Sequence, residues 1–364
     1  MNYTYNRFSQ WYVTLTRWEY WPFAVVYFPI FFYWMWLSVK ARSLFFFFLS
    51  NPSIETGGMT GESKIAILDL IPEEYKPKGI LIEADTSFDT VCMLLARKDV
   101  VFPIIAKPDI GERGTDVEKI TNIHALKTYH TSHNVTYIIQ EFVDYPIELG
   151  IFYYRFPDTP AGKITSVTQK LFMNVTGDGE HTIQELMCNN PRSAFQLKRF
   201  QKEHPELLKQ VPEKYVNVLL EPIGNHCRGT TFINSNHIID QKLTDIIDRI
   251  SKSIPGFYFG RYDLKCRSIE ELKQGKHIRI MELNGAGAEP AHIYHPGFSL
   301  FKAYKVLFHH WNILYKISMM NHAKGLAFPS FHEAKTQMFL SPEKVQNTPT
   351  ETDVFVRHSA SHAN

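Results

Sequence analysis

The aromatic segment over residues 18–49, WEYWPFAVVYFPIFFYWMWLSVKARSLFFFFL, constrains this chain more than any other feature. Residues 21–37 carry no charge, Trp and Tyr crowd both ends of that stretch, and Lys40 and Arg42 follow it. Aromatic rings and cations of this kind anchor proteins at membrane–water interfaces. The segment therefore predicts a membrane-associated helix at the front of the chain.

The way in which this segment meets the membrane stays open. Its uncharged stretch is at the low end of the roughly 17–25 residues that a spanning helix needs. Pro22 and Pro29 would weaken or kink such a helix. We therefore expect a monotopic or re-entrant anchor at least as much as a span. A buried core helix or a subunit contact is the alternative, and the run Phe45–Phe48 argues against it because such a patch would aggregate if exposed.

The bulk composition is that of a globular protein. The chain has 364 residues, 44% of them hydrophobic and 21% charged, which is enough for one large or two modest cores. A formal net charge of +2 gives no basic field for nucleic acid. The four cysteines lie far apart and form no Cys-x-x-Cys pair, so neither a disulfide framework nor a zinc ribbon is expected. This usage fits the cytosol.

The pattern of apolar residues predicts an α+β chain with a mainly antiparallel sheet. Stretches such as VTYIIQEFV, IELGIFYYRF and HIRIMELN are typical of strands, and HIIDQKLTDIIDRISKSI has helical spacing. The Gly-, Ser- and Thr-rich stretch 50–64 indicates a boundary. We expect four parts: an aromatic membrane-associated segment 1–50, a short part 51–105, a core 106–325, and a polar, partly disordered tail 326–364.

Several charged or amide side chains stand on predicted strands or just after them. They are Lys64, Lys107, Glu141, Glu148, Asp263, Glu282 and Asn284. Lysines can neutralise phosphates, and carboxylate and amide oxygens are the ligands that Mg²⁺ prefers, with nucleotide phosphates completing its shell. As a set, these residues indicate a site for a nucleotide with magnesium.

The order and spacing of this set, over roughly residues 60–300, resemble the ATP-grasp superfamily and its D-alanine–D-alanine ligase and cyanophycin-synthetase-like branches. The segments that match include GESK, FPIIAKPDIGERG, QEFV, GRYDLK, MELN and VTQKLFMNVTGDGEHTIQEL. The resemblance implies an ATP-grasp fold, in which two α+β subdomains with antiparallel sheets grip the nucleotide. Here that fold would follow the membrane-associated helical segment.

The resemblance also implies which residues bind the nucleotide. The two lysines would meet the phosphates, the glycine loop after the second lysine would close over them, the QEFV strand would face adenine, and a later carboxylate would bind ribose. In that order these residues are Lys64, Lys107, Gly111, Gly114, Glu141, Val143 and Glu148.

The metal and substrate residues follow from the same resemblance. Asp263, Glu282 and Asn284 would hold Mg²⁺, as two ions in the usual case, with Mn²⁺ as a substitute. The groups at the transferred phosphate or a carboxylate would be Arg261, Lys170, Arg228 and His226. The loop AGAEPAHIYHPG would face the acceptor, through Glu289, His292 and His295.

The implied activity is that of an ATP-dependent carboxylate–amine ligase, which activates a carboxylate as an acyl phosphate and couples it to an amine. Its substrates would be small or lipid-linked, and it would lie at the cytoplasmic face of a membrane, where ATP is available. The family usually has a full α/β domain before the ATP-binding part, whereas about 60 residues precede Lys64, so the substrates and the oligomeric state stay open.

Two other readings remain at this point. The chain could be a membrane-attached ATP-binding protein or a phosphotransferase that does not ligate. It could also be a metal-dependent hydrolase, because the three-residue spacing of Glu289, His292 and His295 would align them on one face of a helix.

Overall fold

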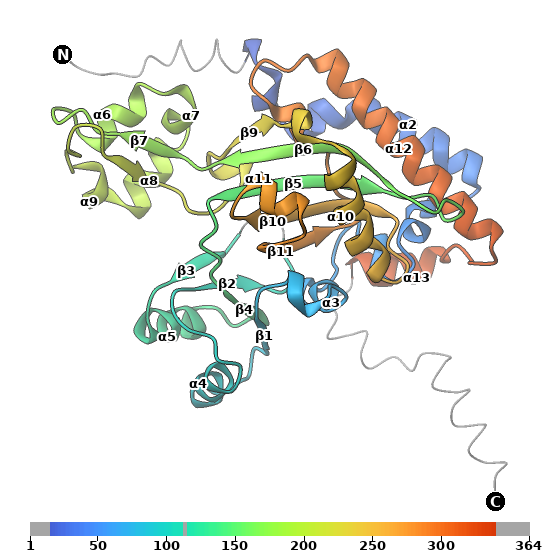
Figure 1. The fold of residues 1–364 in the computed structure, drawn as a ribbon, viewed down its shortest axis with the longest axis horizontal. Coiled ribbons are helices and arrows are strands. Elements are labelled where there is room, and N and C mark those ends of the chain that lie inside the picture. The colour runs from blue at the N-terminus through green and yellow to red at the C-terminus, as the bar shows by residue number, and fades with distance from the viewer. Residues whose placement is uncertain (1–14, 112–114, 340–364) are drawn as a thin grey trace, which may run out of the picture.

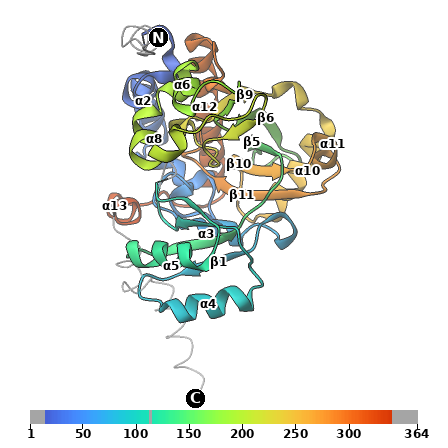
Figure 2. The ribbon, with the colours of Figure 1, turned by 90° about the vertical axis from the view of Figure 1, so that its left-hand side faces the viewer.

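A computed structural model describes residues 15–111 and 115–339 and has the predicted α+β class (Figure 1). Its strands pair antiparallel throughout the described residues. A four-stranded sheet has the order β1-β4-β2-β3, and a five-stranded sheet has the order β11-β10-β5-β6-β9. The smaller sheet lies beneath the larger one (Figure 2).

The four-stranded sheet forms the first unit with two amphipathic helices. Its strands are β1 (Gly79–Ile82), β2 (Ile104–Pro108), β3 (Glu118–Ile120) and β4 (Tyr137–Glu141), and its helices are α4 (Phe88–Arg97) and α5 (Ile123–Ser132). Ser87 and Asn122 cap the two helices by accepting hydrogen bonds from backbone amides of the first turn. Apolar residues of both helices and of the strands form one core under this sheet.

The five-stranded sheet has one dry face and one face with charge. Its strands are β5 (Ile147–Tyr154), β6 (Lys163–Leu171), β9 (Thr231–Asn234), β10 (Phe259–Cys266) and β11 (Ile278–Asn284). Helix α10 (Gln241–Ser253), with α3 (Lys64–Asp69) and α11 (Ile269–Lys273), packs on the dry face through the largest core. Because side chains alternate along a strand, every second residue points to the opposite face.

A small third unit interrupts the larger sheet between β6 and β9. It holds β7 (Asn174–Thr176), β8 (Asn217–Leu219), α6 (Ile183–Cys188), α7 (Pro191–Ala194), α8 (Leu197–Glu203) and α9 (Pro205–Leu208) around a core of its own. The long helical pattern of residues 182–211 is therefore broken into four short helices. Pro191 and Pro205 each stand at a helix start, where proline is tolerated.

Helices α2 (Phe23–Ala41) and α12 (Leu300–Ala323) pack side by side along their length (Figure 1). α2 is long and apolar enough to cross a membrane by length and composition, and it runs through Pro29 without a break. Only its inner stripe is buried, at Val26, Ile30 and Leu37 among others, so its outer face is an exposed apolar surface. This is compatible with the predicted membrane-associated segment.

The prediction for the phenylalanine run was wrong. Phe46, Phe47 and Phe48 are not part of an exposed or membrane-facing patch but form a 3₁₀ turn that is buried beneath α12. They pack with Phe152 and Phe259 of the five-stranded sheet. The run is thus a core element, and it joins the apolar N-terminal helix to the rest of the fold.

The predicted division of the chain meets the strands as follows. The boundary between residues 105 and 106 falls inside β2, whose partners β3 and β4 lie on its later side and whose sheet also includes the earlier β1. The segment predicted as a polar tail begins with α13 (Phe331–Phe339), and residues 340–364 lie outside the described residues.

Asn51 ties the N-terminal segment to β10. Its fully buried amide donates to the carbonyls of Gly57 and Phe259 at 2.9 and 2.8 Å, and its oxygen accepts from the amides of Tyr258 and Phe259 at 2.9 and 3.0 Å. All four polar contacts are with backbone groups. Asn51 therefore fixes the height at which residues 46–57 meet the sheet.

We expect Asn51→Ala to lower the free energy of unfolding by about 3 kcal/mol, because it leaves four buried backbone groups without their partner. Urea unfolding followed by tryptophan fluorescence, in one detergent for all variants, measures this loss. Asn217→Ala, at an exposed position on β8, is the matched control and should change stability by less than about 0.5 kcal/mol. Equal losses in both variants would contradict the role given to Asn51.

Candidate nucleotide and substrate cleft

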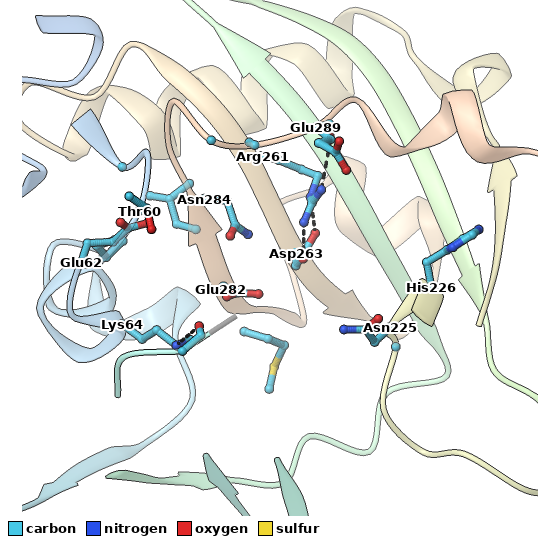
Figure 3. A pocket seen from close by; sticks show the side chains of 18 of the residues that line it. Thr60, Glu62, Lys64, Asn225, His226, Arg261, Asp263, Glu282, Asn284 and Glu289 are labelled. Carbon is cyan, nitrogen blue, oxygen red and sulfur yellow. Dashed lines mark hydrogen bonds and ion pairs between the residues drawn. The ribbon is translucent and has the colours of Figure 1, made fainter. Parts of the chain in front are cut away.

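A cleft of about 1100 Å³ lies between the two larger sheets and extends to α2 and α12. Its wall includes side chains from β2, β5, β6, β10 and β11 (Figure 3). Most of the predicted site residues line it: Lys64, Lys107, Gly111, Val143, Glu148, Lys170, His226, Arg261, Asp263, Glu282, Asn284 and Glu289. Glu141, Arg228, His292 and His295 are not in its wall, and Gly114 lies outside the described residues.

A chain of alternating charges crosses the floor of the cleft. Arg261 on β10 makes a bidentate pair with Asp263, with nitrogen–oxygen distances of 2.8 and 3.1 Å. Lys170 on β6 lies 3.3 Å from Asp263 and 2.9 Å from Glu148 on β5. Lys265 is 3.9 Å from Glu148 at the far end. Three strands therefore share one network, and each anion in it touches a cation.

Burial and charge act against each other in this network. Burial alone would raise the pKa of Asp263, but Arg261 and Lys170 outweigh it and hold that pKa below the ordinary value. Burial alone would lower the pKa of Lys170, but Asp263 and Glu148 outweigh it and raise that pKa. Both groups stay charged at neutral pH, and neither can lose its partner cheaply.

A bulge in β11 decides which of its side chains reach the cleft. Asp263 pairs with Glu282, but the next residue, Leu264, pairs with Ile280, so Met281 is the extra residue. Before the bulge Ile280 points to the dry face, whereas after it Leu283 does so. The alternation is thus shifted by one residue, and Glu282 and Asn284 join Arg261 and Asp263 on the cleft face (Figure 3).

Two lysines approach the cleft from the side of the smaller sheet. Lys107 of β2 donates to Gln140 at 3.1 Å, and burial lowers its pKa. Lys64, the first residue of α3, donates to the carbonyls of Asp109 and Gly111 at 3.0 and 2.7 Å. Lys64 therefore fastens the start of α3 to the loop after β2, while Lys107 presents a buried cation across the cleft from Glu282, to which it is electrostatically coupled.

The segment that joins the two sheets runs from β4 to β5. Glu141 was predicted to face adenine, but its carboxylate accepts from the backbone amide of Lys78 at 3.2 Å. Its neighbours Gln140 and Val143 line the cleft instead, and the carbonyl of Val143 accepts from Lys265 at 3.0 Å. The buried Nε2 of Gln140 has no partner among the described residues, so it is a donor available to a ligand.

Sequence reasoning missed Gln140 and Lys265, although period-two alternation could have found both. Arg261, Asp263 and Lys265 are spaced by two residues on β10 and share a face. Gln140 precedes Glu141 and therefore points the other way. The motif was matched correctly at QEFV, but the residue that faces the cleft is displaced by one.

The donor set fits a hard divalent cation in chemical type. Asp263 and Glu282 stand opposite one another in register on adjacent strands, and Asn284 follows two residues later on the same face. The buried Nδ2 of Asn284 has no hydrogen-bond partner among the described residues. Within residues 15–111 and 115–339, no cluster of three or more His, Cys, Asp or Glu side chains is placed to hold a metal, so any cation here would share two carboxylates, an amide and its ligand's own oxygens.

At the other end of the cleft, Glu289 meets two tyrosines. The hydroxyl of Tyr294 lies 3.2 Å from one carboxylate oxygen of Glu289, and Tyr27 of α2 hydrogen-bonds to both Glu289 and Tyr294. Arg261 donates to the backbone carbonyl of Glu289 at 3.0 Å rather than to its carboxylate. His226, packed between Phe232 and Tyr294, is kept neutral because burial, with Arg192 nearby, lowers its pKa to about 3.

The remaining predicted residues have other partners. Arg228 pairs with the buried Glu221 at 2.9 Å. His292 is buried, and burial lowers its pKa to about 4. His295 accepts from the amide of Asn234 at 3.3 Å. Glu289, His292 and His295 do not lie on one helix, since only His292 belongs to the 3₁₀ turn Ala291–Tyr294, so the arrangement predicted for a metal hydrolase is absent from this described loop.

Gly224 leaves room for the charged network. A Cβ at Gly224 would overlap the carboxylate of Glu148 and come within 3.0 Å of the Lys170 side chain. We expect Gly224→Ala to displace the Glu148–Lys170 pair and to weaken ATP binding by about tenfold or more, as measured by calorimetry. In Gly79→Ala, the matched control, the added carbon meets only the tip of Ile65, at 3.2 Å, so ATP affinity should stay within about twofold of wild type.

Acid should destabilise this fold through His310, which lines the cleft and packs against Phe152. Burial lowers its folded-state pKa to about 3 from 6.5, so the unfolded chain binds a proton that the folded protein refuses. Stability therefore falls as pH drops below about 6.5. Between pH 7 and 5 we expect His310→Phe to lose about 2 kcal/mol less than wild type, measured by urea unfolding at both pH values. His309→Phe, at the exposed neighbour, should behave as wild type does.

The comparisons with known proteins find matches among solved structures. No family model matches the sequence, and no curated protein matches it. The matching structures are ATP-grasp ligases. This is the superfamily that the sequence motifs indicate.

Three of these structures describe the range. A bifunctional glutathione synthetase from Pasteurella multocida matches with 16% identity over 68% of this chain and 36% of its own, at a TM-score of 0.36. The VanG D-Ala:D-Ser ligase from Enterococcus faecalis matches with 12% identity over 71% and 61%, at 0.40. The D-alanine–D-alanine ligase from Bacillus anthracis complexed with ATP matches with 13% identity over 72% and 66%, at 0.39. The chain thus spans between about a third and two thirds of these proteins, and reaction and substrate rest on the cleft itself.

Proposed function

We propose that this protein is an ATP-dependent carboxylate–amine ligase that uses Mg²⁺-ATP. The observation that supports this most is the facing arrangement in the cleft. Lys107 comes from one sheet, and Lys170, Arg261, Asp263 and Glu282 come from the other. Cations can bind phosphates here while the carboxylates remain available, which suits a nucleotide held between two sheets.

The chemistry asks for positioning rather than for a protein nucleophile. The substrate carboxylate attacks the γ-phosphorus, ADP leaves, and the amine then displaces phosphate from the acyl phosphate. Lys107 and Lys170 would stabilise the phosphates, and Arg261 would stabilise the charge on the transferring group or on the acyl oxygen. Asp263, Glu282 and Asn284 would hold Mg²⁺, which neutralises phosphate charge when bound.

The charged network explains how the free protein tolerates this site. Until a nucleotide arrives, Arg261 and Lys170 neutralise Asp263, and Lys170 also neutralises Glu148. On binding, Mg²⁺ would compete with these cations for Asp263, and the freed lysine and arginine could turn to phosphate oxygens. The net charge of the cleft changes little in that exchange, so the desolvation cost stays small.

We further propose that α2 lies in the surface of a membrane, at its cytoplasmic face where ATP is available, and does not cross it. Its inner stripe packs on α12 near both ends, through Val26 and Leu37. α12 exposes Lys302, Lys305 and Lys316, whose charges cannot enter the hydrocarbon core cheaply. A helix held along its length by such a partner fits the interface, with only its outer face in lipid.

Calorimetric titration of ATP with Mg²⁺ into the full-length protein tests the site. We expect metal-dependent binding that weakens by about tenfold or more in Glu282→Gln, because an amide replaces a charged oxygen ligand without a change of shape. Glu270→Gln on the exposed surface of α11 is the matched control and should bind as wild type does. If wild type, folded by its thermal transition, does not bind ATP, the ligase proposal fails.

A trapping experiment separates ligation from the open alternatives. Hydroxylamine replaces the amine while carboxylates are supplied in turn with Mg²⁺-ATP. An acyl phosphate intermediate would give a hydroxamate together with ADP and phosphate. Nucleotide turnover without any hydroxamate would favour a phosphotransferase, and ATP binding without turnover would favour a binding protein.

A further inference from the structure

The cleft has a second end with a different chemistry. Beyond the charged floor its wall is apolar and aromatic, and both N-terminal and C-terminal helices build it. The residues from α2 and α12 that form this end are Val26, Tyr27, Leu307, Trp311 and Leu314, with Phe23 at the margin. Such a wall has nothing to offer the phosphates of ATP, so it serves another part of a substrate.

A single carboxylate stands where the charged and apolar ends meet. Glu289 accepts from the hydroxyl of Tyr294, and Tyr27 completes a rim of two phenols around it. Arg261 is directed to the Glu289 backbone, so the carboxylate charge is not cancelled by a bidentate partner. A carboxylate framed by aromatic rings binds an ammonium group well, through charge-assisted hydrogen bonds and the faces of the rings.

The apolar end of the cleft reaches the outer surface of α2. Phe23 lines the cleft and is also 51% exposed. From there an exposed apolar stripe continues along α2 through Val25, Phe28, Phe32 and Val39. Neither α2 nor α12 contains an acidic residue, and α12 exposes three lysines. An anionic lipid surface complements this face, so the cleft would open at the lipid.

We propose that the acceptor of this protein is an amphiphilic amine: an ammonium headgroup on an apolar tail, taken from the membrane surface. The headgroup lies at Glu289, and the tail lies between α2 and α12 along Val26, Leu307 and Trp311. This inference rests on the proposed ligase function and names the substrate class of the same site. It also makes α2 a wall of the active site as well as an anchor.

The reaction balances with these components alone. The substrate carboxylate gains the γ-phosphoryl group as the bond to ADP breaks. The amine, having lost a proton, attacks the acyl carbon, so the carbon–nitrogen bond forms and the carbon–oxygen bond to phosphate breaks. In sum, ATP, a carboxylate and an ammonium group yield ADP, phosphate, an amide and one proton.

Photolabelling tests the inference on the full-length protein in nanodiscs of phosphatidylcholine and phosphatidylglycerol. The probe is a 12-carbon primary alkylamine with a diazirine in its tail, and the comparison probe is the alcohol with the same tail. Mass spectrometry maps the labelled residues. We expect the amine to label Trp311 and Leu314, which face the cleft. Unlabelled dodecylamine should suppress that label.

Three variants give the prediction its controls. Glu289→Gln should reduce amine labelling of the cleft by about tenfold, as expected for one charge-assisted contact, and leave labelling by the alcohol unchanged. Phe23→Gln and Phe32→Gln remove the same exposed side chain from α2, but only Phe23 lines the cleft. Cleft labelling should therefore fall in Phe23→Gln and stay at the wild-type level in Phe32→Gln.

Several outcomes would overturn the inference. Label confined to outward residues such as Phe28 and Phe32 would show that the tail stays in lipid. Equal cleft labelling by amine and alcohol, or no effect of Glu289→Gln, would show that no ammonium site exists. ATP titration into the same nanodiscs keeps the two proposals apart. If ATP binds and the amine does not enter, only this inference fails, whereas absent ATP binding removes the ligase function itself.

Discussion

The exchange of charge across β10, β5 and β6 is the constraint on which the rest of the site depends. Arg261, Asp263, Lys170 and Glu148 are largely withdrawn from water, and each would be costly without its neighbours. Three strands must therefore stay in register for the network to be neutral. The same condition keeps cations and carboxylates on one face, where a nucleotide and its metal can replace the internal partners.

The second constraint is the separation of a dry face from a charged face on one sheet. α10 and the strand residues of the large core use one set of alternating positions, and the cleft uses the other. The bulge at Met281 is what lets β11 serve both. Without it, Glu282 and Asn284 would point into the core under α10, where two polar groups would lack partners. A local irregularity thus makes a shared site out of two strands.

The N-terminal segment replaces part of what a separate domain could provide. Asn51 and the buried turn Phe46–Ser50 hold it to the sheet, while α2 keeps an apolar outer face. Tyr27 then reaches Glu289 from the inner side of the same helix. One segment therefore contributes to the core, to the wall of the cleft and to an exposed apolar surface. Loss of any of these contacts would be felt in the other two.

The sequence by itself determined the α+β class, the antiparallel strands, the apolar helix and most of the charged residues at the cleft, because residue types and periodicity are local properties. Only the tertiary structure decided which of these residues face one another. It displaced the cleft residue from Glu141 to Gln140, turned Glu282 toward Asp263 through a bulge, and buried Phe46 to Phe48. Strand register and burial depend on partners far along the chain, so no local pattern could have fixed them.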